Sequence, residues 1–280
     1  MRNFTFKGQL LTAVFMLLGC LSIQAANDDL ITKQITINLD KAGTLPNKIA
    51  SSEMYKITNL KIIGEINGTD WNMIREMAGR DNRGYGTEGK LSVLDLSEAK
   101  IVKGGDSYYP GDNCYTSNDE IGEKAFTDCS RLTSLTLPVG ITSIGYDAFA
   151  YCSGLTSLTL PAGITSIGEF AFSYCSGLTS IYVYAEKVPR IGRYAFEGCA
   201  SRKCTLYVPK GTYDNYRLSE FGYFENIVEF DATGIDKTTT STDVEEVSRY
   251  SLNGQRLAVP VKGLNIVKYS DGTVRKVVVK

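Results

Sequence analysis

A pattern of apolar and polar positions occurs twice in tandem near the middle of the chain. Residues 132–154 read LTSLTLPVGITSIGYDAFAYCSG and residues 155–177 read LTSLTLPAGITSIGEFAFSYCSG, so the period is 155 − 132 = 23 residues. Each copy opens with L-x-x-L-x-L, a spacing that places the second and third leucines on one face of a short strand. Tandem copies predict a repeat architecture, because one copy cannot bury its apolar face but a stack can.

The second half of each copy predicts another short extended run followed by a turn back. In the first copy, Ile141 and Ile144 begin and end this run, and Ala148, Phe149 and Cys152 follow it. We expect these apolar side chains to be buried from two sides of a coil. The predicted fold is a solenoid, mostly β, with short helical or irregular segments on its convex side.

The pattern extends beyond the two copies in both directions. Six strand positions share the spacing or part of it, and they begin near Ile57, Leu91, Leu132, Leu155, Leu178 and Leu206. The unit that starts at Leu91 is 132 − 91 = 41 residues long, so it carries an insertion of 41 − 23 = 18 residues. We place this insertion within residues 99–120 and interpret it as a surface loop.

Both ends of the stack need a cap to cover their open faces. Residues 27–90 are predicted to be an N-terminal capping region with a divergent repeat. There, Thr69 and Asp70 are expected to cap a helix that ends at Gly79. Its expected apolar face consists of Trp71, Ile74, Met77 and Ala78. Residues 91–230 are predicted to hold the remaining repeats and a C-terminal cap in residues 213–227, which are rich in tyrosine and phenylalanine.

The L-x-x-L-x-L-P, I-x-x-I-G, A-F and Cys elements, in that order at this spacing, resemble the leucine-rich repeat of BspA-type bacterial surface proteins, also called the Treponema pallidum type. The resemblance implies a leucine-rich-repeat solenoid with no enzymatic activity and no cofactor. It also implies adhesion, in which the protein recognises host extracellular-matrix proteins or the surface proteins of other bacteria.

Residues 1–26 are predicted to be a signal peptide. Arg2 and Lys7 supply its positive charge, residues 10–18 are apolar, and a small-residue cleavage site ends at Ala25. The apolar stretch is shorter than the roughly 20 residues that a membrane-spanning helix needs. An alternative is that LLGC at residues 17–20 directs lipidation of Cys20. Either route predicts an exported protein, at the cell surface or outer membrane or outside the cell.

The C-terminal residues differ in composition from the repeats. Residues 231–247 are rich in threonine, serine and acidic residues and are predicted to form a linker. Residues 248–280 are predicted to form two hairpins, with turns at Asn253-Gly254 and Asp271-Gly272. This small β module resembles the C-terminal sorting domains of Bacteroidota, and the alternative is a β module without a sorting role.

The net charge and the absence of histidine limit the functions that we expect of this protein. A formal net charge of −1 gives no basic surface of the kind that nucleic-acid binding requires, so no nucleic-acid partner is expected. The sequence contains no histidine, which removes the commonest general base and metal ligand. We therefore predict a protein that is not an enzyme.

The cysteines and acidic residues have structural interpretations that need no metal. Four cysteines recur at spacings of 23, 23 and 24 residues, namely Cys129, Cys152, Cys175 and Cys199. This spacing predicts one buried position in each coil. Cys114 and Cys204 break the pattern, so a disulfide among Cys114, Cys199 and Cys204 remains open in an exported protein. The insertion also holds carboxylates that could bind calcium, namely Asp106, Asp112, Asp119 and Glu120. No EF-hand spacing is present, so we expect a solvated loop and no metal site.

Tyrosines supply the candidate binding residues. Tyr182, Tyr184 and Tyr207 fall at outward positions of successive strands, and solenoids bind partners on such extended faces. The insertion adds three more tyrosines, Tyr108, Tyr109 and Tyr115. We predict that these two groups together contact a protein ligand. The alternatives are that the strand tyrosines pack under the C-terminal cap, or that they bind glycans by stacking on sugar rings.

Overall fold

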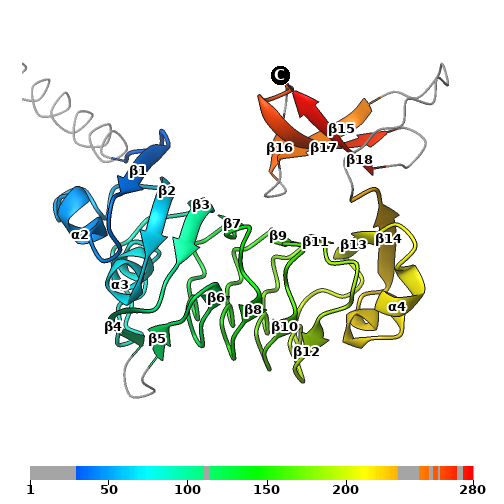
Figure 1. The fold of residues 1–280 in the computed structure, drawn as a ribbon, viewed down its shortest axis with the longest axis horizontal. Helices are drawn as coiled ribbons and strands as arrows, with labels where there is room; N and C mark the ends of the chain where they lie inside the picture. The colour runs from blue at the N-terminus through cyan, green and yellow to red at the C-terminus, as the bar shows by residue number, and fades with distance from the viewer. Residues whose placement is uncertain are drawn as a thin grey trace, which may run out of the picture.

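The computed structural model describes residues 30–109, 114–232, 246–251, 255–257, 259–269 and 274–279. The predicted signal peptide, Cys20 and most of the predicted linker lie outside these residues. Within them, the helices are all too short or too polar to span a membrane. Parallel strands are stacked one after another along the length of the molecule, and an antiparallel sheet lies near one end (Figure 1).

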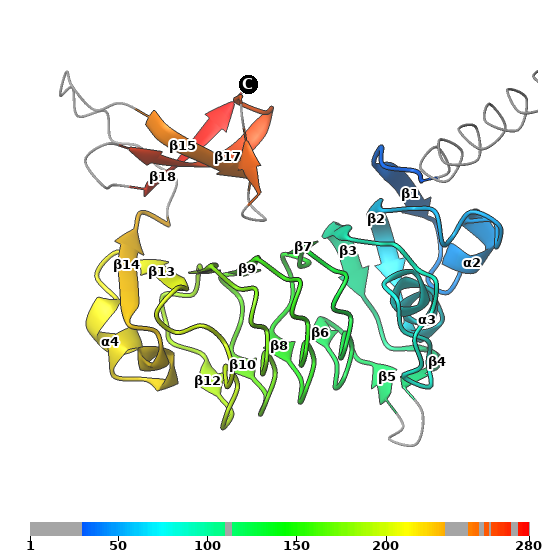
Figure 2. The same ribbon diagram turned by 180° about the vertical axis from the view of Figure 1, so that it is seen from behind.

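Eight parallel strands lie side by side along one face, and we call them together the first sheet (Figure 2). Four of them pair in the order β1-β2-β3-β7 and four in the order β14-β13-β11-β9, all parallel. They comprise β1 (Ile35–Leu39), β2 (Asn59–Ile66), β3 (Val93–Ile101), β7 (Ser134–Thr136), β9 (Ser157–Leu160), β11 (Ser180–Val183), β13 (Thr205–Pro209) and β14 (Asn226–Phe230). All six predicted strand positions are present, and β1 and β14 extend the series at its two ends.

A second parallel sheet follows the other half of each repeat. Its four strands are β6 (Glu120–Ile121), β8 (Ser143–Ile144), β10 (Ser166–Ile167) and β12 (Arg190–Ile191), which pair in that order. Equivalent residues pair in register, as Ser143 with Ser166 does. At Gly168 an added Cβ would stand 2.6 Å from the backbone of Gly145 in the preceding coil. Glycine therefore lets the coils stack closely, and the repeats form a parallel-sheet solenoid.

The core between the two sheets is a row of phenylalanines. The rings of Phe126, Phe149, Phe172 and Phe196 follow one another with centroids 5.3, 5.0 and 5.5 Å apart. Beside them, the thiol of Cys152 donates a hydrogen bond to the Phe126 carbonyl at 3.0 Å, and Cys175 repeats this contact one coil later at 3.1 Å. The cysteines that recur in the sequence thus pack inside the coils, as predicted.

The six cysteines within the described residues are buried, and no disulfide links Cys114, Cys199 and Cys204 in this structure. Burial raises the pKa of Cys129 to about 11 and that of Cys199 to about 12. At pH 8 a thiol with a pKa of 11 is about one-thousandth thiolate, which is the reactive form.

We therefore expect the folded protein from residue 27 onward to react very slowly with a disulfide reagent at pH 8. Denaturation should release six reactive thiols, since the buried groups then regain ordinary pKa values. Absorbance of the released thiolate measures both rates. Fast reaction of the native protein, or fewer than six thiols after denaturation, would contradict this expectation.

At the N-terminal end, α2 (Leu45–Lys48) and α3 (Gly68–Met77) pack beside β1 to β3. The predicted apolar face of α3 is confirmed, because Trp71, Ile74, Met77 and Ala78 are all buried. The predicted helix start is wrong by two residues. Asn67 is the N-cap and accepts from the Thr69 backbone N–H, while the Asp70 side chain accepts from the Asn67 N–H. Asp70 therefore completes a capping box instead of capping the helix itself.

The prediction of a surface loop within residues 99–120 needs correction. The first of these residues still belong to β3, which ends at Ile101, and the next form an antiparallel pair, β4 (Gly104–Tyr109) and β5 (Cys114–Thr116). Polar contacts attach this pair to α3, where the Thr69 hydroxyl donates to Asp106 at 2.8 Å. The insertion is therefore an ordered hairpin with one buried side.

At the opposite end, α4 (Tyr213–Arg217) and the 3-10 helix η1 (Glu220–Tyr223) lead into β14. Phe221 and Phe224 lie against Phe196 of the last coil, with ring centroids 5.3 and 5.1 Å away. Tyr216 is also buried, and its hydroxyl donates to the Ala185 carbonyl at 2.6 Å. These aromatic side chains continue the core beyond the last phenylalanine of the repeats.

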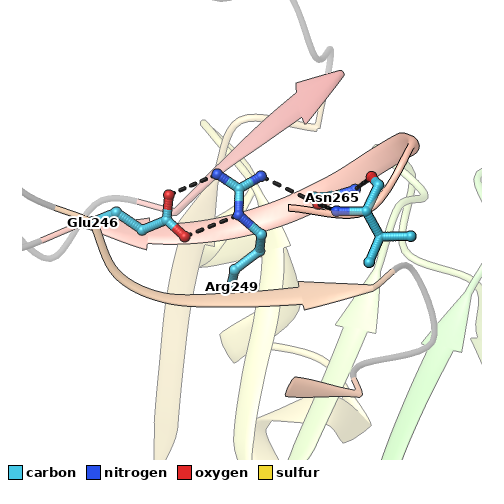
Figure 3. A network of polar contacts seen from close by, with 4 residues as sticks. Glu246, Arg249 and Asn265 are labelled. Atoms are coloured by element: carbon cyan, nitrogen blue, oxygen red, sulfur yellow. Dashed lines mark hydrogen bonds and ion pairs between the residues drawn. The ribbon is translucent and has the colours of Figure 1, made fainter. Parts of the chain in front are cut away.

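The C-terminal sheet is antiparallel and has the order β16-β15-β17-β18. Its strands are β15 (Glu246–Ser251), β16 (Arg256–Leu257), β17 (Gly263–Tyr269) and β18 (Val274–Val279). The buried Arg249 guanidinium donates to both Glu246 oxygens, at 2.9 and 2.6 Å, and to the Asn265 side-chain oxygen at 3.1 Å (Figure 3). This network ties β15 to β17, while the two predicted turns lie outside the described residues.

Candidate binding surfaces

The structure brings Tyr182, Tyr184 and Tyr207 together on the outer face of the first sheet. The Tyr182 and Tyr207 rings stack with centroids 4.3 Å apart, and Phe230 of β14 meets Tyr184 edge-on at 5.1 Å. The same cluster includes Ile266 and Val274 of the C-terminal sheet. Tyr182 is only 4% exposed, so the C-terminal sheet covers this part of the predicted binding face.

The polar groups in this contact are incompletely satisfied. The hydroxyl of Tyr184 is buried and has no hydrogen-bond partner among the described residues. Lys276 places its Nζ 4.1 Å from the centroid of the Tyr184 ring and donates to the Ala232 carbonyl at 3.0 Å. Burial lowers the pKa of Lys276, because a desolvated ammonium is costly. The cost of burying these polar groups therefore offsets part of the stabilisation that the aromatic contacts provide.

A cleft of about 690 Å³ lies between the outer face of the first sheet and the C-terminal sheet. Hydroxyl side chains from β3, β7 and β9 line it, together with Tyr184 and Lys276; these hydroxyls are Ser97, Thr136 and Thr159. Thr136 and Thr159 are outward positions of the repeat. Apolar side chains complete the lining, among them Leu137, Val139 and Leu264. The cleft is thus largely apolar, with hydroxyl groups from outward positions of the repeat.

The three tyrosines of the insertion differ in how far they are buried. Tyr108 is buried, lies 6.2 Å from Trp71 between ring centroids and donates its hydroxyl to the Glu123 carbonyl, so it is a core residue and not an exposed contact. Tyr109 is half-buried beside the Arg75 guanidinium and the Lys124 ammonium. Only Tyr115 is exposed. The hairpin geometry explains the difference, since alternate residues of a strand face opposite sides.

Two rows of aromatic side chains lie elsewhere, on the turns that follow the second sheet. Their tyrosines are exposed, and their one phenylalanine, Phe170, is half-buried. In the first row, Tyr151 and Tyr174 are 50% and 45% exposed, and their parallel rings stack with centroids 5.0 Å apart. In the second row, Phe170 lies between Tyr146 at 6.0 Å and Tyr194 at 5.3 Å. We call these two rows the tyrosine ladders.

An uncommon backbone conformation fixes the position of four of the ladder side chains. Tyr151, Phe170, Tyr174 and Tyr194 all have a positive φ, between 55° and 62°. This left-handed conformation costs about 1–2 kcal/mol for a residue other than glycine. Hydrogen bonds between coils hold it in place, as when the Tyr151 N–H donates to the Ser173 carbonyl at 2.8 Å and the Tyr174 N–H to Glu197 at 2.6 Å.

The sequence carries a signal for these ladders that is separate from the apolar pattern. Tyr151 and Tyr174 both precede a repeated cysteine, and the equivalent positions one coil earlier and later are Asp128 and Gly198, which share the positive φ. Aspartate and glycine tolerate that conformation easily. Tyrosine does not, so its recurrence there indicates a requirement for the ring itself.

Comparison with known proteins identifies the repeats. Residues 113–215 match the family model described as the BspA type Leucine rich repeat region, 6 copies. The match includes β5 to β13 and both tyrosine ladders, but not the N-terminal strands or the C-terminal sheet. No curated protein matches the chain significantly. Residues 113–215 are therefore similar to BspA-type leucine-rich repeats.

Proposed function

We propose that this protein is exported and displayed on the surface of a bacterium, where it binds a protein ligand in the manner of an adhesin. The supporting observation is the pair of tyrosine ladders. Their tyrosine side chains are exposed, preordered by the coil backbone and amphipathic, and such tyrosines give contact area at low entropic cost. Candidate ligands are host extracellular-matrix proteins and the surface proteins of other bacteria.

The stacking geometry favours a protein ligand over a glycan. A sugar ring packs on the open face of an aromatic ring, but the Tyr174 ring is occupied on both sides. Tyr151 stacks on one side at 5.0 Å. On the other side lies Gly198, where an added Cβ would approach a Tyr174 ring atom to 2.7 Å. The ladder therefore offers ring edges and hydroxyl groups, which suit the mixed polar and apolar surface of a protein.

The test compares ladder and non-ladder tyrosines in a binding screen. The chain from residue 27 onward is assayed against purified matrix proteins and a glycan array, beside a Tyr151→Ala, Tyr174→Ala double variant. We expect at least about a tenfold loss of affinity for the protein ligand, because exposed tyrosines act as interface hot spots.

A double variant of two exposed tyrosines outside the ladders, Tyr85→Ala and Tyr213→Ala, provides the matched control and should bind normally. A triple variant at Tyr182, Tyr184 and Tyr207 tests the covered face. Thermal unfolding verifies that each variant is folded. Protein binding unchanged by the ladder substitutions, or binding to glycans alone, would contradict the proposal.

A further inference from the structure

A small cleft of about 260 Å³ lies where the last coil meets η1. Tyr194 and Glu197 of the coil contribute to one wall, and Glu220 and Tyr223 of η1 contribute to the other. All four side chains are exposed at its mouth. Backbone and apolar groups supply the remaining lining, including Gly192 and Phe196. We call it the cap cleft, and it contains one end of the second tyrosine ladder.

The cap cleft is negatively charged. Its lining includes two carboxylates and no basic side chain. Among the ion pairs of the described residues, none involves Glu197 or Glu220. The pKa of Tyr223 is raised, first by burial and then by the nearby groups Cys199 and Glu197, which agrees with a carboxylate close to the ring. A cation would therefore meet two carboxylates that make no ion pair within the described residues, which favours its binding.

The aromatic walls of the cap cleft are held in fixed orientations. The Tyr223 hydroxyl donates to the Cys199 carbonyl at 2.8 Å, and its ring meets Phe224 edge-on at 5.3 Å. Tyr194 stacks on Phe170 with the rings inclined by 22°. Neither ring needs to lose much rotational freedom when a ligand binds, which favours affinity.

A second cleft of about 550 Å³ continues from the first along the second sheet. The two clefts share Ile191, Gly192 and Glu220. Paired positions of four successive strands line the larger cleft, running from Glu120 through two serines to Arg190. Since neighbouring strands lie about 4.8 Å apart, these four span about 14 Å. This length accommodates about four residues of extended chain on one side of an anchor in the cap cleft.

We propose that the cap cleft binds an arginine side chain of the protein partner, with the flanking residues of that partner extended over the second sheet. This proposal rests on the proposed function and names the chemistry of the partner. A guanidinium is planar, so it can stack on a tyrosine ring while its N–H groups donate to carboxylates. The paired tyrosines and glutamates of the cap cleft supply both kinds of contact within a volume that suits one side chain.

The test titrates the full chain with the peptide acetyl-Gly-Ser-Arg-Ser-Gly-amide and follows the ring signals of labelled tyrosines by NMR. The signals of Tyr194 and Tyr223 are assigned from Tyr194→Phe and Tyr223→Phe. We expect both signals to shift saturably. A peptide with citrulline in place of arginine keeps the shape but loses the charge, and should bind at least about tenfold more weakly.

The double variant Glu197→Gln, Glu220→Gln should weaken arginine binding by at least about tenfold. The matched control, Glu123→Gln with Glu186→Gln, alters two exposed glutamates outside the cap cleft and should leave the affinity unchanged. Equal affinity for citrulline and arginine, or no effect of the Glu197 and Glu220 substitutions in a folded protein, would overturn the proposal.

The two proposals fail separately. If the arginine peptide binds but no protein ligand depends on Tyr151 and Tyr174, the cap cleft stands and the proposed function does not. If a protein ligand binds through these tyrosines while the arginine peptide leaves Tyr194 and Tyr223 unshifted, the cap cleft proposal is overturned.

Discussion

Replacing Phe149 by alanine should lower the free energy of unfolding by about 3–5 kcal/mol, the range seen for large-to-small changes of buried aromatic residues. The Phe149 ring is fully buried and lies between Phe126 at 5.3 Å and Phe172 at 5.0 Å. Its removal leaves a cavity that the neighbouring rings cannot fill, because each is held by its own coil. Two aromatic contacts are lost as well.

The architecture increases the consequence of this substitution. A coil contacts only its two neighbours, so the stability of a repeat protein depends on each interface between coils. A defect at Phe149 weakens two successive interfaces in the middle of the stack. Urea unfolding followed by circular dichroism measures the change. Val139→Ala is the control, since Val139 is 75% exposed and should cost less than about 0.5 kcal/mol. A loss below about 1 kcal/mol for Phe149→Ala would contradict the role of the ring stack.

Asp70→Ala should destabilise the N-terminal end by about 3–5 kcal/mol. The Asp70 carboxylate is fully buried and accepts from three backbone N–H groups, those of Gly43 at 2.6 Å, Leu45 at 2.8 Å and Asn67 at 2.9 Å. Alanine leaves all three donors without this acceptor, and each buried unsatisfied group costs about 1–3 kcal/mol. The carboxylate joins the start of α2 to the start of α3, so its loss removes this polar connection between the two helices.

A matched substitution distinguishes this effect from a simple loss of charge. Asp40→Ala removes a carboxylate that is 91% exposed and only 3.5 Å from Lys48 in a surface ion pair, which should change stability by less than about 1 kcal/mol. Amide hydrogen exchange in α3 localises the damage. Exchange in α3 that is as slow in Asp70→Ala as in Asp40→Ala would show that Asp70 does not hold this end together.

The repeated core could be predicted from the sequence because the period of 23 residues marks every inward position. Leu135 and Leu158 lie in successive strands, and Cys152 and Cys175 make the same contact in successive coils. The hairpin in the insertion was not predictable in the same way. Its buried side depends on contacts with α3, such as Asp106 with Thr69, which are distant in sequence and occur once.

The exposure of the candidate binding residues was predicted less well, also for physical reasons. The outward positions of the first sheet follow from strand alternation, but the cover over Tyr182 depends on where the C-terminal sheet lies, and no local pattern encodes that. The exposure of Tyr151 and Tyr174 depends on a left-handed backbone that hydrogen bonds between coils impose. A pattern of apolar and polar residues identifies which positions recur, but not which turn conformation each position adopts.

The close approach of glycine to the preceding coil has a consequence for how such a protein can change its length. Gly168 and Gly192 each meet the backbone one coil earlier at the same place, so the pitch is set by the contact itself and not by the ends of the molecule. An additional copy of the unit would make the same glycine contact with its neighbour. It would also add one more aromatic side chain in line with the others. The number of copies can therefore set the length of the tyrosine ladders without a change in any coil.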